Sequence, residues 1–286
     1  MQRVLVAGAT GYLGKAVVRE LKARGHFVRA LARSPEKLSS VQGSFDEVVT
    51  AQVTEPKTLA HVCGGMDVVF SSIGITRQKD GLTFRDVDYQ GNVNLLEAAQ
   101  SAGVRKFIYV SVFNGPTLRH LDIIDAHEAF VDVLKESGVD YVVLRPNAYF
   151  SDMCEFLEMA RKGRVYLIGR GDNRVNPIDA ADLAVRCSDA LDGEQQEIDV
   201  GGPDIMTYRD VAELAFRCLH KRARISTVPL WMMTVATAVT RIFSKHRAGL
   251  LAFFTTAMTS DAVAPATGVR RLESHFESLC ARGGRP

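Results

Sequence analysis

Three glycines near the amino end of the chain, Gly8, Gly11 and Gly14, have the spacing of an anion-binding turn. They lie in the stretch VLVAGATGYLGKAVVREL, where a short apolar run precedes them and helically spaced apolar residues follow. Such an order of strand, turn and helix points the first free N–H groups of the helix at a bound phosphate. We therefore predict a pyrophosphate site here, although a sharp turn alone would also select glycine.

The next predicted strand ends at Arg33, and Ser34 and Lys37 follow it closely. In dinucleotide-binding folds this strand end reaches the adenosine ribose, where an acidic residue accepts hydrogen bonds from the free 2′-hydroxyl of NAD. A guanidinium suits a 2′-phosphate instead, because it can form two parallel hydrogen bonds to that group. These residues predict NADP(H) in preference to NAD(H), and the alternative is a solvated arginine at the strand end.

These residues need a framework that brings strand ends together. Strands are predicted at 47–50, 66–73, 106–111 and 139–145, and helices at 56–62, 86–102 and 121–137. Such alternation implies an α/β fold with right-handed crossovers, a doubly wound parallel sheet and helices on both faces. Ligands are then expected beyond the carboxyl ends of the strands, where the segments 70–74 and 109–115 terminate.

The composition is that of an ordinary globular protein. Of the 286 residues, 47% are hydrophobic and 24% are charged, which suits one large α/β domain or one domain with a lobe. Lysine and arginine total 35 against 33 acidic residues, so the net charge of +2 gives no reason to expect a nucleic acid partner. The cysteines are dispersed and the histidines form no ligand pattern, so we expect no metal site and a cytoplasmic protein with reduced thiols.

Three segments resemble the atypical short-chain dehydrogenase/reductases. They are GATGYLG at 8–14, VDYQGNVNLLEAAQSAGVRKFIYVSV at 87–112 and SGVDYVVLRPNAYF at 137–150. The similar branches are the NmrA-like, isoflavone reductase-like and divinyl chlorophyllide reductase-like proteins, and the related accessory subunit of respiratory complex I. The resemblance implies an NAD(P)-binding Rossmann core at 1–150. It implies that 151–286 supplies the remaining Rossmann strands and a small C-terminal substrate lobe, with a small-molecule substrate between lobe and core.

The resemblance also implies which residues contact the cofactor. The pyrophosphate would be held by Gly8, Thr10, Gly11, Tyr12, Leu13 and Gly14, and the adenosine end by Arg33. Ser72, Ile73 and Gly74 would border the adenine ribose, and Ser111 and Val112 would border the nicotinamide. The carboxamide side would be lined by Pro146, Asn147, Ala148 and Tyr149.

The catalytic pattern of the family is missing from this chain. A typical reductase of the family carries Tyr-x-x-x-Lys on the helix after the fifth strand, where the lysine and the cofactor ribose lower the tyrosine pKa. No tyrosine here has a lysine four residues later. Tyr141 has Arg145 at that distance, but both lie in a predicted strand. Standard carbonyl reduction is therefore disfavoured.

His127 stands where branches of the family without the tyrosine place a lysine. An imidazole exchanges protons near neutral pH, and Asp125 or Glu128 would tune it. The alternative is a packing role, because His127 borders the apolar stripe that contains Ala126 and Phe130.

Ser111 would orient a substrate carbonyl at the end of its strand, or alternatively bond to local backbone. Four acidic residues are predicted to be helix-surface or first-turn charges: Asp86, Asp88, Glu155 and Glu158.

The sequence as a whole predicts an NADP(H)-dependent enzyme that reduces a small, largely apolar substrate by hydride transfer. A conjugated double bond tolerates the missing tyrosine better than a ketone does. The alternative is a non-catalytic NADP(H) sensor or stabilising subunit, which would keep the glycine turn and lack the catalytic pair. A nucleotide-sugar epimerase is disfavoured, because such enzymes usually need the tyrosine.

The carboxyl-terminal part of the chain is predicted to contain a helix beginning near Asp179 and another N-capped by Thr207. The segment 229–258 has two apolar runs of about 15 residues or fewer, below the roughly 18 to 20 that span a bilayer. Its Trp231-Met232-Met233 and Phe253-Phe254 clusters would form lobe core or a pocket lid, lie on a membrane surface, or contact a partner helix.

Overall fold

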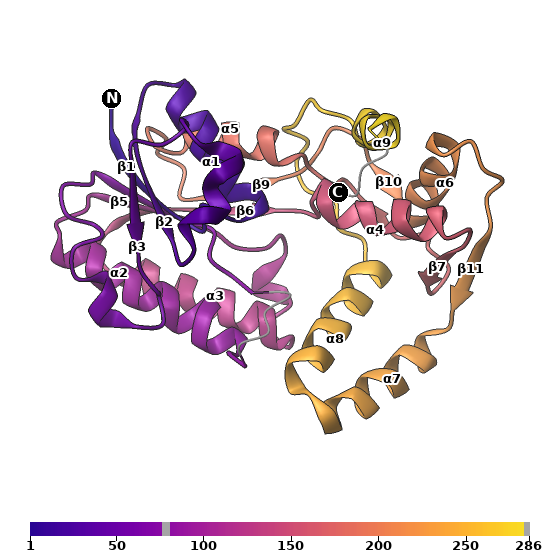
Figure 1. Ribbon diagram of the computed structural model, residues 1–286. Coiled ribbons are helices and arrows are strands. Elements are labelled where there is room, and N and C mark those ends of the chain that lie inside the picture. Colours follow the sequence, from indigo (N-terminus) through magenta and orange to yellow (C-terminus); the bar gives the residue numbers. More distant parts are fainter. Residues whose placement is uncertain (76–80, 283–286) are drawn as a thin grey trace. The chain divides into compact units, whose positions relative to one another are not determined.

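The computed structural model describes residues 1–75 and 81–282 (Figure 1). The chain forms two compact units, and each contains a hydrophobic core. The first unit comprises Met1–Arg145 and Leu183–Ile198, and the second comprises Pro146–Asp182 and Asp199–Pro286. The chain therefore enters the second unit at Pro146, returns to the first for a short stretch, and ends in the second.

A seven-stranded sheet carries the first unit, in the order β3-β2-β1-β4-β5-β6-β9. Its strands are β1 (Arg3–Ala7), β2 (Phe27–Ala32), β3 (Glu47–Thr50), β4 (Val68–Ser71), β5 (Lys106–Val110), β6 (Asp140–Pro146) and β9 (Glu197–Val200). The pairs from β3 to β6 are all parallel. Hydrogen bonds from Val143 to Gln196 and from Asn147 to Val200 advance in the same sense along β6 and β9, so β9 is parallel too. This order confirms the predicted doubly wound Rossmann fold.

Helices cover both faces of this sheet (Figure 1). α1 (Tyr12–Ala23) lies on one face, and α2 (Asn92–Ser101) and α3 (Asp122–Glu136) lie together on the other. α5 (Ala180–Asp189) ends on the α1 side, where Asp189 pairs with Arg24 at 2.7 Å. Central strands such as β4 are buried throughout because helices exclude water from both of their faces.

Two predicted helices differ in the structure. The segment predicted as a helix over 56–62 forms only one short 3₁₀ turn, η2 (Pro56–Leu59), since so short a helix gains little from propagation. The helix predicted over 86–102 begins as a π-helix, η3 (Arg85–Gly91), and continues as α2. Asn92 Nδ2 donates to the carbonyl oxygen of Asp88 at 2.8 Å, which occupies the acceptor that an α-helical N–H of Asn92 would use. Two further 3₁₀ turns are η1 (Pro35–Val41) and η4 (Gly115–Thr117).

The second unit packs helices around two small sheets. Its helices are α4 (Phe150–Arg161), α6 (Tyr208–Cys218), α7 (Leu230–Phe243), α8 (Lys245–Thr259) and α9 (Leu272–Ala281). β7 (Val165–Ile168) pairs in parallel with β11 (Ile225–Val228), and β8 (Arg174–Val175) pairs antiparallel with β10 (Met206–Thr207). The core of this unit lies between α4, α6 and α9, where Leu157, Phe216 and Phe276 are buried together.

Two predicted helix caps are confirmed in this region. Thr207 Oγ1 accepts the backbone N–H of Asp210 at 3.0 Å, and the Asp210 carboxylate accepts the N–H of Thr207, which completes a capping box at α6. Asp179 accepts the N–H of Ala181 at 2.8 Å at the start of α5. Within the described residues, no helix combines the length and the apolar character that crossing a membrane requires.

Candidate cofactor and catalytic site

The glycine turn joins β1 to α1 and has the geometry of an anion cradle. Gly8 has a φ of +87°, a conformation that favours glycine, and its carbonyl oxygen accepts the N–H of Gly11 at 2.9 Å. A Cβ on Gly14 would overlap that carbonyl oxygen and lie 2.6 Å from the carbonyl carbon, so α1 packs directly on the turn. Gly11 is the N-cap of α1, and the first turn of the helix contains no acidic residue. The positive end of the helix is therefore available to an anion.

The other residues predicted around the pyrophosphate differ in exposure. Tyr12 and Gly11 are exposed, Thr10 is half-buried, and Leu13 is buried in the contact between α1 and the sheet. The turn therefore presents backbone and the Tyr12 side chain outward.

The predicted adenosine-end residues follow β2, the strand beside β1. Leu31 of β2 pairs with Ala7, the last residue of β1 before the turn. Arg33 follows Leu31 by two residues. Arg33 and Lys37 are exposed, and Ser34 is the N-cap of η1. Sheet order therefore places the end of β2 beside the strand that leads into the glycine turn, and contact of these residues with a cofactor stays a prediction.

Ser72, Ile73 and Gly74 follow β4, the strand on the other side of β1. The Ser72 N–H donates to the Ala7 carbonyl at 3.1 Å, and Ser72 Oγ would lie 2.7 Å from a Cβ on Gly8. Asn92 supports the same strand end, because it accepts from Ser71 Oγ at 2.6 Å and donates to the Ile73 carbonyl at 3.3 Å. Ser72 therefore borders the turn directly, and Ile73 and Gly74 continue from it toward Asn92 and His127.

His127 lies in α3 at the centre of a hydrogen-bonded chain. Tyr109 at the end of β5 contacts His127 Nδ1 through its hydroxyl at 2.6 Å, and His127 Nε2 lies 3.2 Å from Asp88 Oδ1. Since a hydroxyl can donate to Nδ1, the arrangement suits an imidazole that donates from Nε2 to the carboxylate. Both ring nitrogens of His127 are therefore engaged within the first unit.

Asp88 lies in the first turn of η3, which is one of the two predicted alternatives, and the other, a position on the helix surface, was wrong. Asp88 is fully buried where η3 packs against α3, and it accepts the N–H of Ile75 at 3.2 Å. Burial raises the pKa of its carboxyl group, and the hydrogen bond and charge of His127 oppose that rise. Burial likewise raises the pKa of the Tyr109 phenol well above its usual value, and the charge of Asp88 adds to the effect.

The expected partners of His127 were also wrong. Asp125 lies 3.7 Å from Arg85 on the surface, and Glu128 points to a different cluster. Ser111 Oγ donates to Glu128 Oε1 at 2.6 Å, and the buried guanidinium of Arg145 bonds both Glu128 and Ser111. Burial lowers the pKa of Arg145, but the hydrogen bond and charge of Glu128, with those of Glu197, outweigh it and raise the pKa.

The remaining predicted contacts continue from these strand ends. Val112 follows Ser111 and is half-buried. Pro146 is the last residue of β6, and the Asn147 side chain donates to Asn176 Oδ1 at 2.8 Å and to the Ala262 carbonyl. Tyr149 is the N-cap of α4, and its N–H donates to Asp152. Contacts of these residues with a cofactor, like those of the glycine turn, Arg33 and the ends of β4 and β5, stay predictions.

Cysteine and metal chemistry have little support in the described part of the chain. Burial raises the pKa of the Cys63 and Cys154 thiols to about 12 and that of Cys218 to about 11. A search of the described residues finds no group of three His, Cys, Asp or Glu side chains that could hold a metal ion.

A family model described as NAD(P)H-binding matches residues 8–194, which is more than half of the chain. The chain belongs to this NAD(P)H-binding family. The match begins at the first glycine of the turn and includes the strand ends described above.

The relatives include the divinyl chlorophyllide reductase branch that the sequence resembles. A divinyl chlorophyllide a 8-vinyl-reductase of Oryza sativa is 28% identical over 98% of this chain and 79% of its own length. The photosystem II assembly factor Ycf39 of Synechocystis is 27% identical over 84% of this chain and 75% of its own length. An NADPH-dependent quinone oxidoreductase of Escherichia coli, solved with NADPH, has the same fold with a TM-score of 0.77 at 18% identity, over 96% of this chain and 99% of its own.

Sequence reasoning missed the buried roles of four residues that the structure places beside the candidates: Asp88, Tyr109, Glu128 and Arg145. One signal for Asp88 was present, because it precedes Asn92 by four residues and Leu95 by seven, the spacing of one buried helix face. For Arg145, an arginine inside an apolar strand predicts a buried partner of opposite charge.

Proposed function

We propose that this protein binds NADP(H) in its first unit and reduces a conjugated double bond in a small, largely apolar molecule. The observation that carries the proposal is the glycine turn, where the backbone of Gly8 and Gly14 leaves room only for hydrogen and the N-terminus of α1 is free of acidic residues. The fold neighbour solved with NADPH and the relative named as a vinyl reductase support the cofactor and the reaction class.

Each predicted cofactor residue would have a defined role. N–H groups of the turn would bind the pyrophosphate, and Arg33 with Ser34 and Lys37 would bind the 2′-phosphate. Ser72–Gly74 and Ser111–Val112, at the ends of adjacent strands, would border the adenine ribose and the nicotinamide. When bound, the cofactor supplies the hydride, and the protein orients the two reactants.

The proton that completes the reduction has two candidate sources, water and His127. Because the Tyr109 hydroxyl and Asp88 engage both ring nitrogens, the imidazole has to release one of them before it can protonate a substrate. The geometry favours water as the proton source. His127 would then position the loop at Gly74, because its ring packs so closely on this residue that a Cβ added there would lie 3.5 Å from His127 Cε1. Ser111 is likewise engaged by Glu128 and would position the loop at Val112.

A non-catalytic sensor or stabilising subunit is the second candidate. It is favoured by the internal hydrogen bonds of both candidate catalytic side chains and by the relative named as an assembly factor. The free state of all five cysteines supports the further proposal that either function is performed in a reducing compartment such as the cytoplasm.

The cofactor proposal is tested by calorimetric titration with NADPH and NADH. We expect tighter binding of NADPH, and we expect Arg33→Ala to reduce its affinity about tenfold or more while NADH binding changes little. Arg105→Ala, which removes an exposed arginine outside the site, is the matched control. Equal affinity of the wild type for both cofactors would refute the preference, and failure to bind either would refute the function.

The reaction proposal is tested by NADPH consumption with panels of enones, vinyl compounds and ketones. Reduction of the conjugated substrates but not the simple ketones is expected of the reductase. Binding of NADPH without consumption, together with discrimination between oxidised and reduced cofactor, would instead establish the sensor. His127→Gln separates the proton sources, because activity within tenfold of the wild type assigns the proton to water and a loss above a hundredfold with normal cofactor binding assigns it to His127.

A further inference from the structure

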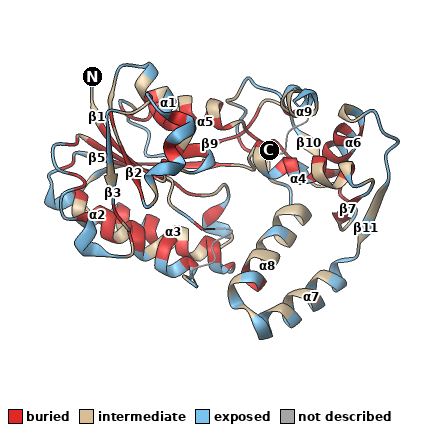
Figure 2. Ribbon diagram, viewed as in Figure 1, coloured by how far each residue is buried: buried red, intermediate tan, exposed pale blue. Residues whose placement is uncertain are grey.

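α7 has an apolar face that the rest of its unit leaves exposed. None of its 14 residues is buried, and in Figure 2 its ribbon carries only the intermediate and exposed colours. Trp231, Ile242 and Phe243 are 67%, 80% and 82% exposed. Such exposure is unusual for large apolar side chains and marks an interaction surface.

The exposed apolar side chains lie on one side of the helix. At about 100° per residue, six of the seven large ones fall within an arc of roughly 120°, and only Leu230, at the first position of the helix, lies outside it. These six residues, which we call the α7 apolar face, are Trp231, Met232, Val235, Val239, Ile242 and Phe243. Three polar side chains, Thr234, Thr237 and Arg241, lie outside this arc. The helix is therefore amphipathic, with its apolar side toward solvent.

All acidic and basic side chains in the segment around α7 are basic ones. Residues 214–260 contain seven lysines and arginines and no aspartate or glutamate. Arg241, Lys245 and Arg247 lie at the turn between α7 and α8 and are exposed, and no described acidic side chain forms an ion pair with them. Charge complementarity thus calls for an anionic partner.

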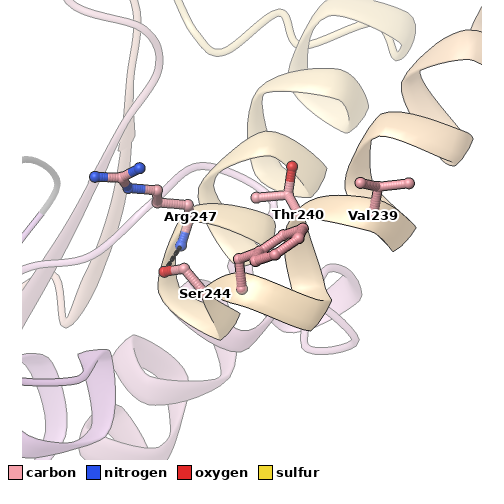
Figure 3. A pocket seen from close by; sticks show the side chains of 5 residues that line it. Val239, Thr240, Ser244 and Arg247 are labelled. Carbon is pink, nitrogen blue, oxygen red and sulfur yellow. Dashed lines mark hydrogen bonds between the residues drawn. The ribbon is translucent and has the colours of Figure 1, made fainter.

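A hollow at the α7–α8 turn has both apolar and cationic lining. It is lined by Val239, Thr240, Phe243, Ser244 and Arg247 and has a volume of about 550 Å³ (Figure 3). The Arg247 N–H donates to Ser244 Oγ at 3.3 Å, which fixes the start of α8 beside the apolar lining. An arginine next to an apolar hollow suits a phosphate group joined to a hydrocarbon chain.

We propose that α7 lies flat on the surface of a bilayer that contains anionic phospholipids, with the α7 apolar face among the acyl chains and the three turn cations among the phosphates. A helix of 14 residues is about 21 Å long, shorter than the hydrocarbon core of about 30 Å, so it lies on the membrane. A second copy of the chain is a poorer occupant, because a symmetric contact would bring two cationic segments together without an acidic residue between them.

The single tryptophan of the chain, Trp231, reports directly on this surface. We expect its emission to shift to the blue when the protein is mixed with phosphatidylcholine–phosphatidylglycerol vesicles, with little shift in phosphatidylcholine alone. The protein should float with the anionic vesicles, and lipids with brominated acyl chains should quench the emission. Added salt should weaken the interaction.

Two variants assign the contact to α7. Arg241→Gln, Lys245→Gln and Arg247→Gln together should weaken partitioning on the order of a hundredfold, since each cation near an anionic surface contributes about fivefold. Ile242→Ser with Phe243→Ser should abolish flotation, and both side chains are exposed enough for the fold to tolerate the change. Circular dichroism melts of each variant verify folding.

Matched controls carry the same chemical changes elsewhere. Lys57→Gln, Arg105→Gln and Lys162→Gln together remove three exposed cations, and Val269→Ser replaces an 80% exposed apolar residue outside α7. Both should partition like the wild type. Absence of flotation with an unshifted Trp231, equal partitioning into neutral vesicles, or equal losses in variants and controls would overturn the proposal. A lipid-independent blue shift that grows with protein concentration would also overturn it, in favour of a second copy.

Discussion

Replacing Gly11 with alanine tests whether the turn holds a pyrophosphate rather than merely folding sharply. Gly11 has a φ of −76°, which any residue adopts, and an added Cβ would lie 3.2 Å from the Gly8 carbonyl oxygen. Alanine at an N-cap costs about 0.5–1 kcal/mol relative to glycine, whereas restriction of the unfolded chain gains about 0.4–1 kcal/mol. The free energy of unfolding should therefore change by no more than about 1 kcal/mol.

Cofactor binding should respond far more strongly to the same methyl group. A Cβ at the N-cap of α1 occupies the space through which a pyrophosphate approaches the first N–H groups of the helix. Losing one charge-assisted hydrogen bond costs about 1.5–3 kcal/mol, so NADPH affinity should fall by a factor between about ten and one hundred. Calorimetric titration measures the affinity, and urea denaturation measures the stability.

Two further alanine variants complete the experiment. Gly64→Ala adds a Cβ 3.5 Å from the His61 carbonyl oxygen, outside the turn. It should leave NADPH affinity unchanged, and it should change the free energy of unfolding by no more than Gly11→Ala does. Gly14→Ala forces a Cβ into the backbone of Gly8 and should lower the free energy of unfolding by several kcal/mol. Unaltered NADPH binding by a stable Gly11→Ala protein would refute the reasoning about the turn.

Three more predictions concern the buried polar clusters. Glu128→Ala should lower the free energy of unfolding by about 3–5 kcal/mol, because it leaves the buried Arg145 guanidinium without its nearest carboxylate; a loss under 1 kcal/mol in urea denaturation would contradict this. Burial raises the pKa of Asp88. Between about pH 4, where the carboxyl of the unfolded chain titrates, and the higher pKa in the folded protein, the folded protein binds more protons, so its stability falls as pH rises through this range. Asp88→Asn removes this loss, so its stability relative to the wild type should increase from pH 4.5 to 7.5, and a constant or decreasing difference would disprove it. Tyr109→Phe should cost about 1–3 kcal/mol by removing the donor to His127 Nδ1, and an unchanged histidine ring signal in ¹⁵N NMR would show that the bond is absent in solution.

Local patterns in the sequence were sufficient for the elements that position the cofactor turn. The spacing of Gly8, Gly11 and Gly14 between a strand and a helix depends only on backbone geometry over a few residues, and the structure confirms it. The cap at Thr207 is equally local, because donor and acceptor lie three residues apart. Alternation of strands and helices determined a parallel sheet with few permitted topologies.

The partners of the candidate catalytic residues depended on tertiary structure. Tyr109 and His127 are 18 residues apart and Ser111 and Glu128 are 17 apart, so both contacts need α3 packed against the end of β5. Ser111 and Arg145 are 34 apart, so their contact needs the completed crossover from β5 to β6. The sequence assigned Asp88 to a helix surface or a first turn because it is charged, whereas its burial depends on the packing of η3 against α3.

For the apolar segment 229–258, too, the sequence determined one part of the answer and the tertiary structure the other. The sequence showed two apolar runs interrupted by arginine and lysine, and their length disfavoured a spanning helix. Whether those side chains would be core or surface was open, because the helical spacing of apolar residues is the same in both cases. Only the packed chain decided that α7 buries none of its side chains, since burial depends on which elements the fold brings against a face.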